Sequence, residues 1–559
     1  MRTRRVEVIA LACCILFLLA VQVLFGVRKQ GFHEDEFYSY FSTNRTAGLF
    51  HPDREWVETA PIRDEFVVLP GEGFRYGLVR EVQSWDVHPP LYYQILHTAC
   101  SLFPGVFSKW TGIAVNLIAF VLSLLLLNEI ARHCDLSLSV RVLLLALFGL
   151  NPATLSVNMF IRMYAWLTMW VLLATLLHVR LWEAWSGDEG TASGARRRGM
   201  LLYAAIALCD TAGFLTHYYY AIYAVLIAGV TVASIFLQGR RDAPERVDVR
   251  NALRRVPGFL ASHIAGAALA LILYPTAAAH ILRGYRGREA TEAFFTADNL
   301  MERLSFFAGI TWRIFLSDGG IFFGGIALTL FIVLRRRWRT QPTPGQGQRL
   351  LAPAQGDVKE GIVSLALRLT IACGGYFLIV SKTALLLGDT SIRYLAPVYP
   401  LLLLLMLLFV RMALPERGLI QAVAVLMLVV TTLGAVSDGK VLFLYRENAE
   451  RIAYDDAHRG AAVIVAYNAL TPERIWWITD HILRHEQVFF LEEQNEEPLS
   501  DERIAQAQEL LIYAADEDRQ EAVLQEIADL MYSGGKRARV TSEVVWKRDM
   551  WTLYHMVGE

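Results

Sequence analysis

The sequence contains a succession of apolar stretches, most of them about as long as a bilayer is thick. A transmembrane helix needs about 20 mostly apolar residues. Hydrophobic residues make up 55% of the chain and charged residues 19%, which excludes an ordinary soluble enzyme. We therefore predict a polytopic α-helical membrane protein with about 11 transmembrane helices. The expected spans are 7–26, 110–130, 139–157, 163–183, 200–216, 219–238, 256–280, 318–334, 361–380, 394–411 and 418–437.

The first outer loop is expected at 27–109, and one of its apolar stretches is too short to cross the membrane. Residues 89–103 open with Pro89-Pro90 and run for only about 15 residues before Pro104, whereas a span needs roughly 17–25. We predict an interfacial helix there. The basic flank before 7–26 resembles a signal peptide, but the apolar run is long and no small-x-small cleavage site follows, so we expect an uncleaved span.

The distribution of arginine supports this count, because cytoplasmic loops collect Lys and Arg. With 89–103 outside the membrane, the arginine clusters of the predicted inner loops all fall on the inner side, whereas Arg283, Arg286 and Arg288 lie in an outer loop against this bias. The odd number of spans places the C-terminus on the outer side. The predicted inner clusters are Arg132, Arg196–Arg198, Arg240 to Arg255, Arg335–Arg339, Arg411 and Arg417. Residues 340–360, rich in Gly, Pro and Gln, are expected to be a cytoplasmic linker.

The C-terminal residues 438–559 are no longer membrane-like. Short apolar runs at 462–466, 488–491 and 510–513 alternate with acidic stretches, residues 517–533 are amphipathic, and 538–557 alternate like paired strands. We predict a small extracytoplasmic α/β domain, separate from a membrane domain at 1–437.

An acidic and aromatic segment at 31–40 follows the first span directly. Its His33, Glu34, Asp35 and Glu36 lie beside a membrane exit, where carboxylates are costly to desolvate and often functional. The plainer interpretation, a solvated helix cap, carries about equal weight on these residues alone.

Further polar motifs fall at the outer ends of the predicted spans. His217 and its tyrosines also fit an interfacial aromatic belt, and Arg162 fits a snorkelling anchor. Cations that share a site with a carboxylate at this boundary suit a lipid-linked phosphate substrate: cations hold the phosphate, and a carboxylate takes the proton of an attacking hydroxyl. The candidate donor-binding residues are Asp86, His88, Arg162, Tyr164, His217, Tyr218, Arg283, Arg286, Arg288, Lys382, Arg393 and Tyr394.

The order of these motifs resembles that of the GT-C glycosyltransferases, closest to the branch of protein O-mannosyltransferases and lipid A aminoarabinose transferases. The resemblance covers residues 1 to about 437. It rests on Asp35-Glu36, His88-Pro-Pro-Leu-Tyr-Tyr93, Arg162-Met-Tyr164, His217-Tyr218 and Arg393-Tyr-Leu395. It implies transfer of a sugar from a polyprenyl-phosphate carrier to an acceptor hydroxyl, with inversion, on the outer face.

The resemblance also implies residue roles and shows departures. Asp35 corresponds to the usual candidate base, with Glu36 beside it, and Asp86 and His88 match an acidic residue and a cation before the Pro-Pro pair. Related bacterial sequences often carry a Glu two residues before the Arg-x-Tyr arginine, where this chain has Phe160. Glu34, Glu36 or Asp86 are the alternatives for a second carboxylate.

We accordingly predict a glycosyltransferase of a bacterial inner membrane. Its partners would be a polyprenyl-phosphate-linked sugar, a glycan, lipid or protein acceptor, and membrane lipid. A net charge of −1 gives no reason to expect nucleic acid. No cofactor is predicted, no Cys/His spacing indicates zinc, and a divalent metal stays open. The alternatives are a secondary transporter, disfavoured because the spans are nearly free of charge, and a non-enzymatic membrane scaffold.

Overall fold

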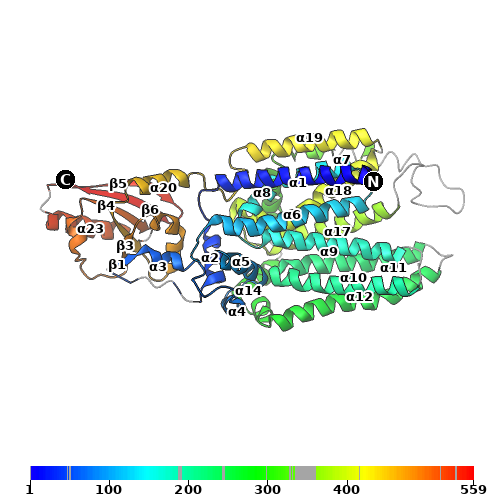
Figure 1. Cartoon of the computed structure of the whole chain (residues 1–559), viewed down its shortest axis with the longest axis horizontal. Coiled ribbons are helices and arrows are strands. Elements are labelled where there is room, and N and C mark those ends of the chain that lie inside the picture. Colours follow the sequence, from blue (N-terminus) through cyan, green and yellow to red (C-terminus); the bar gives the residue numbers. More distant parts are fainter. Residues whose placement is uncertain are drawn as a thin grey trace. The chain divides into compact units, whose positions relative to one another are not determined.

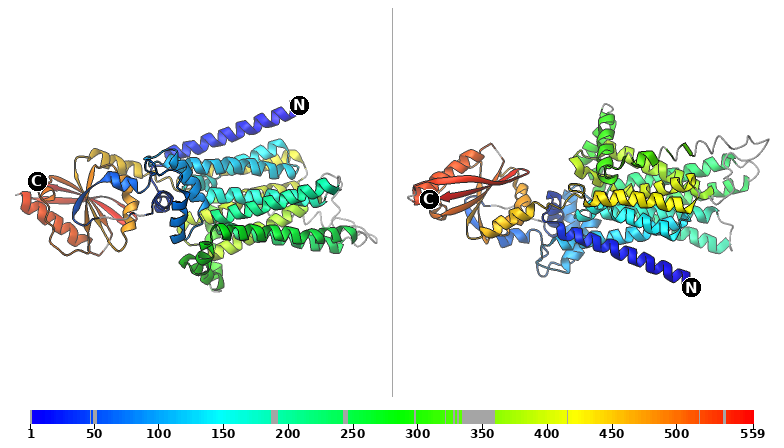
Figure 2. Two further views of the ribbon diagram at one scale, coloured as in Figure 1. Left: turned by 60° about the horizontal axis from the view of Figure 1, so that its bottom comes forward. Right: turned by 90° about the horizontal axis from the view of Figure 1, so that it is seen from above.

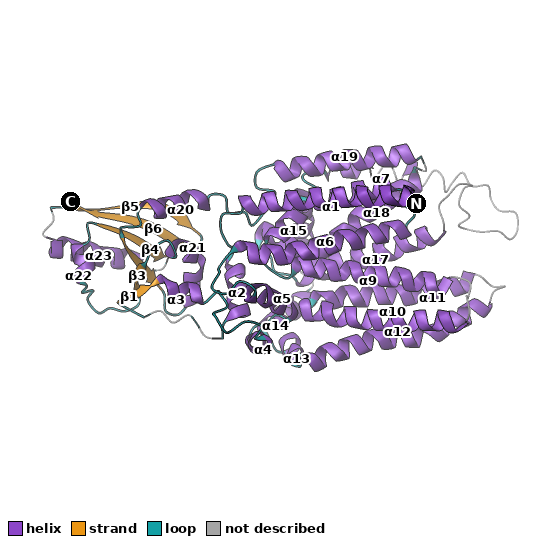
Figure 3. Ribbon diagram, in the orientation of Figure 1, coloured by secondary structure: helices purple, strands orange, loops and turns teal. Residues whose placement is uncertain are grey.

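The computed structural model describes residues 2–46, 48, 52–186, 192–241, 246–296, 299–320, 322–326, 329, 332–333, 360–414, 416–516, 518–535 and 538–559. The chain forms two compact units. The first contains Met1–Val27, Gln83–Tyr92 and Gly112–Leu442, and the second contains Arg28–Val82, Tyr93–Thr111 and Phe443–Glu559. The first unit is built from helices, and the strands belong to the second (Figures 1 and 3).

The first unit is a bundle of long helices that lie alongside one another in all three ribbon views (Figures 1 and 2). Its helices, including those that continue into the second unit, are α1 (Arg2–Arg28), α4 (Tyr76–Trp85), α5 (Leu91–Ser101), α6 (Lys109–His133), α7 (Leu138–Gly149), α8 (Pro152–Met159), α9 (Tyr164–Ser186), α10 (Ala192–Thr216), α11 (Tyr219–Arg241), α12 (Arg246–Leu273), α13 (Thr276–Leu282), α14 (Tyr285–Phe295), α15 (Leu300–Ile310), η2 (Thr311–Phe315), α17 (Glu360–Thr383), η3 (Gly388–Tyr394), η4 (Ala396–Val398), α18 (Tyr399–Ala413) and α19 (Arg417–Val436).

The helix lengths confirm a multi-pass membrane protein. Eight of the described helices are long and apolar enough to cross a bilayer, or up to nine if one bent pair is a single span, and Tyr219–Ile235 is a shorter apolar helix. The expected span at 318–334 and the linker at 340–360 lie mostly outside the described residues. Helix α5 has 11 residues, about 16 Å at 1.5 Å per residue, which is too short to span, as predicted.

The span expected at 139–157 is in fact two helices. α7 and α8 are bent by 55° at the break between them. Pro152 cannot donate a backbone hydrogen bond to the preceding turn, and the Asn151 side chain instead caps α8 by accepting from the N–H of Ala153 at 2.9 Å. A count of apolar residues predicts one continuous helix here and misses this Asn-Pro stop signal, while a single span over 139–157 stays a prediction.

Two other predicted spans have different ends. The stretch 256–280 breaks at Tyr274-Pro275 into α12 and α13, where proline again removes a donor. The stretch 394–411 begins with two 3₁₀ turns, and its α-helix, α18, starts only at Tyr399. Arg254–Leu273 and Ala396–Ala413 are still long enough to cross a bilayer, and Arg393 lies in the irregular turn before the second of them.

The spans also carry more ionisable residues than expected. Asp210 of α10 contacts His263 of α12 at 2.6 Å and accepts a hydrogen bond from Tyr220 of α11 at 2.8 Å. On α17, the Arg368 guanidinium lies 3.8 Å from the ring centroid of Trp182. The expectation of spans nearly free of charge was wrong, and these groups are tolerated because each has a partner inside the bundle.

The second unit combines the C-terminal residues with much of the first loop, which the sequence did not predict. Its sheet has the order β1-β3-β2-β4-β6-β5, with β2, β3 and β4 parallel and β1, β5 and β6 antiparallel to their neighbours. The elements of this unit are α2 (Glu34–Asn44), β1 (Glu55–Glu58), α3 (Thr59–Asp64), α20 (Asn448–Ala457), β2 (Ala462–Tyr467), η5 (Pro472–Ile478), α21 (Thr479–Ile482), β3 (Gln487–Glu492), α22 (Glu502–Gln506), β4 (Glu509–Ala515), α23 (Gln520–Gly535), β5 (Val540–Arg548) and β6 (Trp551–Gly558).

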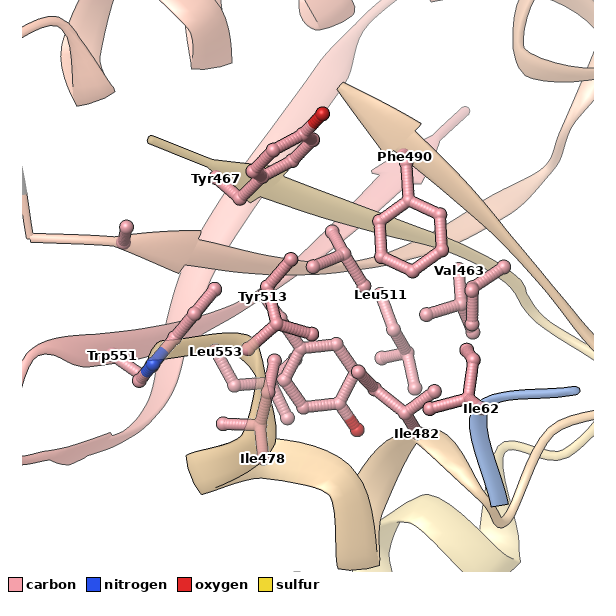
Figure 4. Close-up of a cluster of buried hydrophobic side chains, with 14 of the residues drawn as sticks. Ile62, Val463, Tyr467, Ile478, Ile482, Phe490, Leu511, Tyr513, Trp551 and Leu553 are labelled. Carbon is pink, nitrogen blue, oxygen red and sulfur yellow. The ribbon is translucent and has the colours of Figure 1, made fainter. Parts of the chain in front are cut away.

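Both faces of this sheet are buried, which explains why its central strands are apolar throughout. One face packs residues such as Val463, Leu511 and Ile482, together with Ile62 from the first loop (Figure 4). The other face packs Ile464 and its neighbours against α22 and α23. The predicted small α/β domain is confirmed, while the proposed boundary at 437/438 stays a prediction.

Candidate functional site

The first unit gathers predicted donor-binding residues at the turns between its helices. Asp86 and His88 precede α5, and Arg162 lies between α8 and α9. The Nδ1 atom of His88 is 2.8 Å from Oδ2 of Asp86, and its Nε2 atom is 3.2 Å from Nη2 of Arg162. Three residues from two separate turns thus form a chain of carboxylate, imidazole and guanidinium.

The direction of these hydrogen bonds follows from the chemistry of the groups. A guanidinium nitrogen can only donate, so Nε2 of His88 accepts from Arg162, and its Nδ1–H donates to Asp86. His88 thus connects the carboxylate of Asp86 to the guanidinium of Arg162. Burial alone would raise the pKa of Asp86, but His88, the backbone N–H of Val87 and Arg162 together lower it to about 2.

Arg393 supplies a second buried cation at the same cluster. It lies in η3, its residue is only 3% exposed, and Arg162 is 5% exposed. The guanidinium carbon of Arg393 lies 5.2 Å from the ring centroid of Phe160 and 5.9 Å from that of Tyr164. Rings at such distances attract a cation through their quadrupole, so these aromatic walls hold the charge beside apolar surface.

His217 completes the cluster from the turn between α10 and α11. Its ring centroid is 5.5 Å from that of Tyr164, and its Nδ1 accepts from the backbone N–H of Tyr219 at 3.0 Å. Burial, with smaller effects from His88, Arg162 and Arg393, lowers the pKa of His217 to about 3. The imidazole is therefore neutral at physiological pH, and the two arginines supply the positive charge.

Polar groups inside the bundle hold the irregular segments in place. The Asn116 side chain of α6 donates to the carbonyl oxygen of Phe160 at 2.6 Å, and the Tyr376 hydroxyl donates to that of Tyr394 at 3.1 Å. A Cβ atom on Gly112 would meet the side chain of Ile161, next to Arg162, at 2.2 Å, so glycine is needed there. These hydrogen bonds were not predicted from the sequence, although a lone Asn within an apolar span is a usable signal.

Tyr218 takes part in a neighbouring contact instead. Its hydroxyl is 3.1 Å from Nδ1 of His280, whose Nε2 lies 3.3 Å from the carbonyl oxygen of Ser84. The hydroxyl of Tyr274 donates to the carbonyl oxygen of Gln83 at 2.6 Å. These contacts fix the segment that leads into Asp86 and His88 against α12 and α13.

The remaining predicted cations are placed differently. Lys382 is buried and donates to the Thr296 carbonyl and the Asn299 side chain. Arg303, which the sequence analysis did not single out, donates to the carbonyl oxygen of Lys382 at 2.9 Å. Both side chains hold the backbone around the end of α17.

Three of the predicted arginines are exposed. Arg283 lies between α13 and α14, and α14 contains Arg286 and Arg288. Arg286 pairs with Glu289 at 2.9 Å and lies over the ring of Tyr285. A role for these three arginines in phosphate binding stays a prediction.

The acidic segment belongs to the second unit, and its two predicted catalytic carboxylates differ. Glu36 is fully buried and forms an ion pair with Lys29 at 2.8 Å. Its Oε2 also accepts from the N–H of His33 at 2.7 Å, and the His33 ring accepts from the N–H of Asp35, which completes a capping box on α2. Glu36 thus has the structural role that the plainer interpretation offered.

Asp35 is more accessible. Its side chain is 24% exposed, and its Oδ2 lies 3.7 Å from Nδ1 of His33. The first turn of α2 also contains Glu34 and Glu36, and carboxylates there are favoured by the helix dipole. The catalytic roles of Asp35 and Glu36 stay predictions.

Comparisons with known proteins return structures but no families. No protein-family model matches the chain, and no curated protein matches it. Among solved structures, the chain is similar to ArnT from Cupriavidus metallidurans bound to undecaprenyl phosphate, with 14% identity, a TM-score of 0.45 and 97% of each chain covered. The apo state of ArnT gives 15% identity, a TM-score of 0.42 and the same coverage.

A third similar structure is the archaeal oligosaccharyltransferase AglB from Archaeoglobus fulgidus, in complex with an inhibitory peptide and a dolichol-phosphate. It gives 13% identity and a TM-score of 0.37, and covers 92% of this chain and 70% of that one. Sequence identities of 13–15% and TM-scores of 0.37–0.45 do not indicate the function of this chain.

Proposed function

We propose that this protein is a membrane glycosyltransferase that moves a sugar from a polyprenyl-phosphate carrier to an acceptor hydroxyl. The observation that carries the proposal is the pair of buried guanidinium groups, Arg162 and Arg393, gathered with aromatic rings at the turns between membrane helices. Guanidinium groups bind phosphate oxygens through paired N–H bonds, and the aromatic walls suit the first isoprene unit of a lipid carrier.

The charges of the cluster favour an anion. Two guanidiniums lie near one carboxylate, Asp86, and the neighbouring His217 is neutral, as argued above. The low pKa of Asp86 makes it a poor general base at neutral pH, because a base works best when its pKa lies near the operating pH. Asp86 is better suited to orient His88, which in turn orients Arg162.

We assign the general base to Asp35. Of the two adjacent carboxylates, Glu36 is committed to Lys29 and to the cap of α2, whereas Asp35 is partly exposed. In the proposed reaction the acceptor oxygen attacks the anomeric carbon and its proton passes to the Asp35 carboxylate. The bond from that carbon to the phosphate oxygen breaks, the polyprenyl phosphate leaves as an anion, and a single displacement inverts the configuration.

The arginine distribution of the sequence supports an active site on the outer face of a bacterial inner membrane, with the C-terminus on the same side. A single cysteine introduced near residue 500, in a variant lacking the native cysteines, tests this topology in intact cells. We expect a membrane-impermeant thiol reagent to label it without permeabilisation. Labelling only after permeabilisation would overturn the topology.

The function itself is tested by transfer of label. Purified protein in lipid vesicles is incubated with a radiolabelled polyprenyl-phosphate sugar and an extract of cell-envelope acceptors. We expect transfer by the native protein, strongly reduced transfer by Arg162→Ala and Arg393→Ala, and normal transfer by Arg313→Ala, which removes an exposed arginine that pairs with Asp389. Absence of transfer with every polyprenyl-phosphate sugar and acceptor extract, by protein that is folded and vesicle-inserted, would contradict the proposal.

One observation favours the transporter alternative. The group of Asp210, His263 and Tyr220 joins three membrane helices, and ionisable residues within spans often mark ion pathways. A transporter would move a labelled anionic substrate across sealed vesicles, with movement dependent on Asp210 and without chemical change. An enzyme would alter the substrate in detergent solution, where no gradient exists.

A further inference from the structure

Three side chains of the second unit, widely separated in sequence, converge at one place on its sheet. His458 follows the C-terminus of α20, Glu509 is the first residue of β4, and His555 lies on β6. In the antiparallel pairing of β4 with β6, Leu511 is opposite His555 and Glu509 is opposite Val557. Glu509 and His555 are therefore diagonal neighbours on one face of the sheet.

The polar atoms of the three residues lie close together. Nε2 of His458 is 3.5 Å from Oε1 of Glu509, and Nε2 of His555 is 2.9 Å from the same oxygen. Each residue offers one such atom within 4.8 Å of the others, the one group of its kind among the described residues. Ligands bound at 2.0–2.2 Å to one ion are themselves roughly 3–4 Å apart, so the spacing needs little adjustment.

Tyr454 of α20 orients both imidazoles. Its backbone carbonyl is 2.8 Å from Nδ1 of His458, and its hydroxyl is 2.8 Å from Nδ1 of His555. A carbonyl oxygen only accepts, so Nδ1 of His458 carries the proton and its Nε2 presents a lone pair. This is the arrangement of metal-binding histidines, which donate their other ring N–H to a carbonyl or a similar group.

The contact between Glu509 and His555 is not an ordinary hydrogen bond. Although only 2.9 Å separates the two atoms, Nε2 of His555 has no hydrogen-bond partner among the described residues. The pair is therefore close enough for a hydrogen bond but does not have the geometry of one. The side chains of His458, Glu509 and His555 are 25%, 37% and 13% exposed, so an ion can reach them from solvent.

We propose that His458, Glu509 and His555 bind a divalent transition-metal ion such as Zn²⁺. Imidazole and carboxylate together suit zinc and its neighbours, whereas Mg²⁺ and Ca²⁺ prefer oxygen ligands alone. Three protein ligands leave at least one coordination position for water or for a group from a partner. Bound metal would fasten α20 to β4 and β6.

The test is metal binding by the full-length protein, purified without a histidine tag and stripped with a chelator. Zn²⁺ is titrated in competition with a chromophoric chelator, and the bound ion is counted by mass spectrometry after dialysis. We expect one equivalent in the native protein and at least 100-fold weaker binding in His458→Ala, Glu509→Gln and His555→Ala. His133→Ala is the matched control, because His133 also contacts two carboxylates, Glu129 and Glu183.

A finer variant probes the orientation that Tyr454 imposes. Tyr454→Phe keeps the backbone carbonyl for His458 but removes the hydroxyl that holds His555, and we expect roughly 10-fold weaker binding. Thermal unfolding and gel filtration show whether each variant is folded. Less than stoichiometric Zn²⁺ in the native protein, or a full equivalent retained by folded Glu509→Gln and His555→Ala, would overturn the site.

Discussion

The acidic segment of the second unit and the arginine cluster of the first pair opposite charges in different ways. Lys29 and Glu36 are both fully buried and bonded directly to each other, and Lys29 also donates to the carbonyl oxygen of Phe443 at 2.8 Å. In the cluster, the imidazole of His88 lies between Asp86 and Arg162, and the side chains of Asp86 and His88 remain 32% and 23% exposed.

This difference separates a charged pair that stabilises the fold, Lys29–Glu36, from the arginines that we propose bind the donor phosphate. A buried pair costs several kcal/mol to desolvate and recovers that cost only with close, well-directed bonds. The Lys29–Glu36 pair meets that condition and supports a helix cap. The arginines in the cluster contact aromatic rings and an imidazole, and we propose that the phosphate of the donor binds to them.

The largest expected effect concerns Asp35, the accessible carboxylate next to the buried pair. Asp35→Asn keeps the shape and removes the base, so transfer should fall by about 10²–10⁴-fold, with donor affinity and thermal stability preserved. The measurement is the initial rate of label transfer, with Asp64→Asn, an exposed aspartate that pairs with Arg63, as the control. Near-normal rates for both Asp35→Asn and Glu36→Gln would leave the segment only a helix cap.

Removing one partner of the buried pair should destabilise the second unit. Lys29→Met leaves Glu36 buried without its cation, and such changes typically cost about 3–5 kcal/mol. Arg63→Ala, which breaks an exposed pair, should cost less than about 1 kcal/mol. Thermal unfolding measures both, and the double variant Lys29→Met/Glu36→Leu should regain most of the loss. Equal stability of Lys29→Met and the native protein would show that the Lys29–Glu36 pair does not stabilise the fold.

Arg393 tests whether the arginine cluster of the first unit binds the donor phosphate. Charged hydrogen bonds contribute about 1.5–3 kcal/mol, so Arg393→Ala should weaken the binding of polyprenyl phosphate by about 10–100-fold. Arg393→Lys keeps the charge but not the planar fork, and should restore only part of the affinity. Equilibrium binding of a fluorescent polyprenyl phosphate in detergent measures this. Unchanged affinity in a folded Arg393→Ala variant would remove Arg393 from the donor site.

The smallest expected effect is a pH dependence from His217. Its pKa of about 3 in the folded protein lies below the ordinary value of 6.5, so between these values the unfolded chain binds a proton that the folded protein does not. Stability should therefore fall as the pH drops below about 6.5, by roughly 1–2 kcal/mol from pH 7 to pH 5. Thermal midpoints of the native protein and His217→Asn measure it, and the same pH slope in both would exclude His217 as the cause.

The sequence predicted the membrane helices and the turn residues because both leave local signals. Apolar runs of fixed length indicate spans, and alternate turns of helical hairpins lie at the same end, which explains why His88, Arg162 and His217 were expected together. The break before Pro152 carried a local signal too, but it was outweighed by hydropathy. Asp210 and His263 also stand within predicted spans, but hydropathy does not show that they contact each other.

The features that the sequence did not predict depend on contacts between distant residues. The sequence around Glu36 does not indicate that Lys29 is buried beside the carbonyl oxygen of Phe443. Lys29 and Phe443 are 414 positions apart in the chain. Likewise, no spacing rule connects His458 with Glu509 and His555, since each lies on a different element. Roles that arise only from such packing need a structure.

Strand β1 has a consequence for how the second unit is made. It pairs with the edge of β3, and the adjoining Arg54 donates to the carbonyl oxygen of Asn495, 441 positions further along the chain. During synthesis β1 therefore has no partner strand until the last membrane helix has been inserted and β3 has been made. A fragment starting at residue 443 would leave β3 as an open edge, which invites pairing with other chains. We expect it to self-associate on gel filtration and to become monomeric when a peptide of residues 52–60 is added; a monomer without the peptide would show that β1 is dispensable.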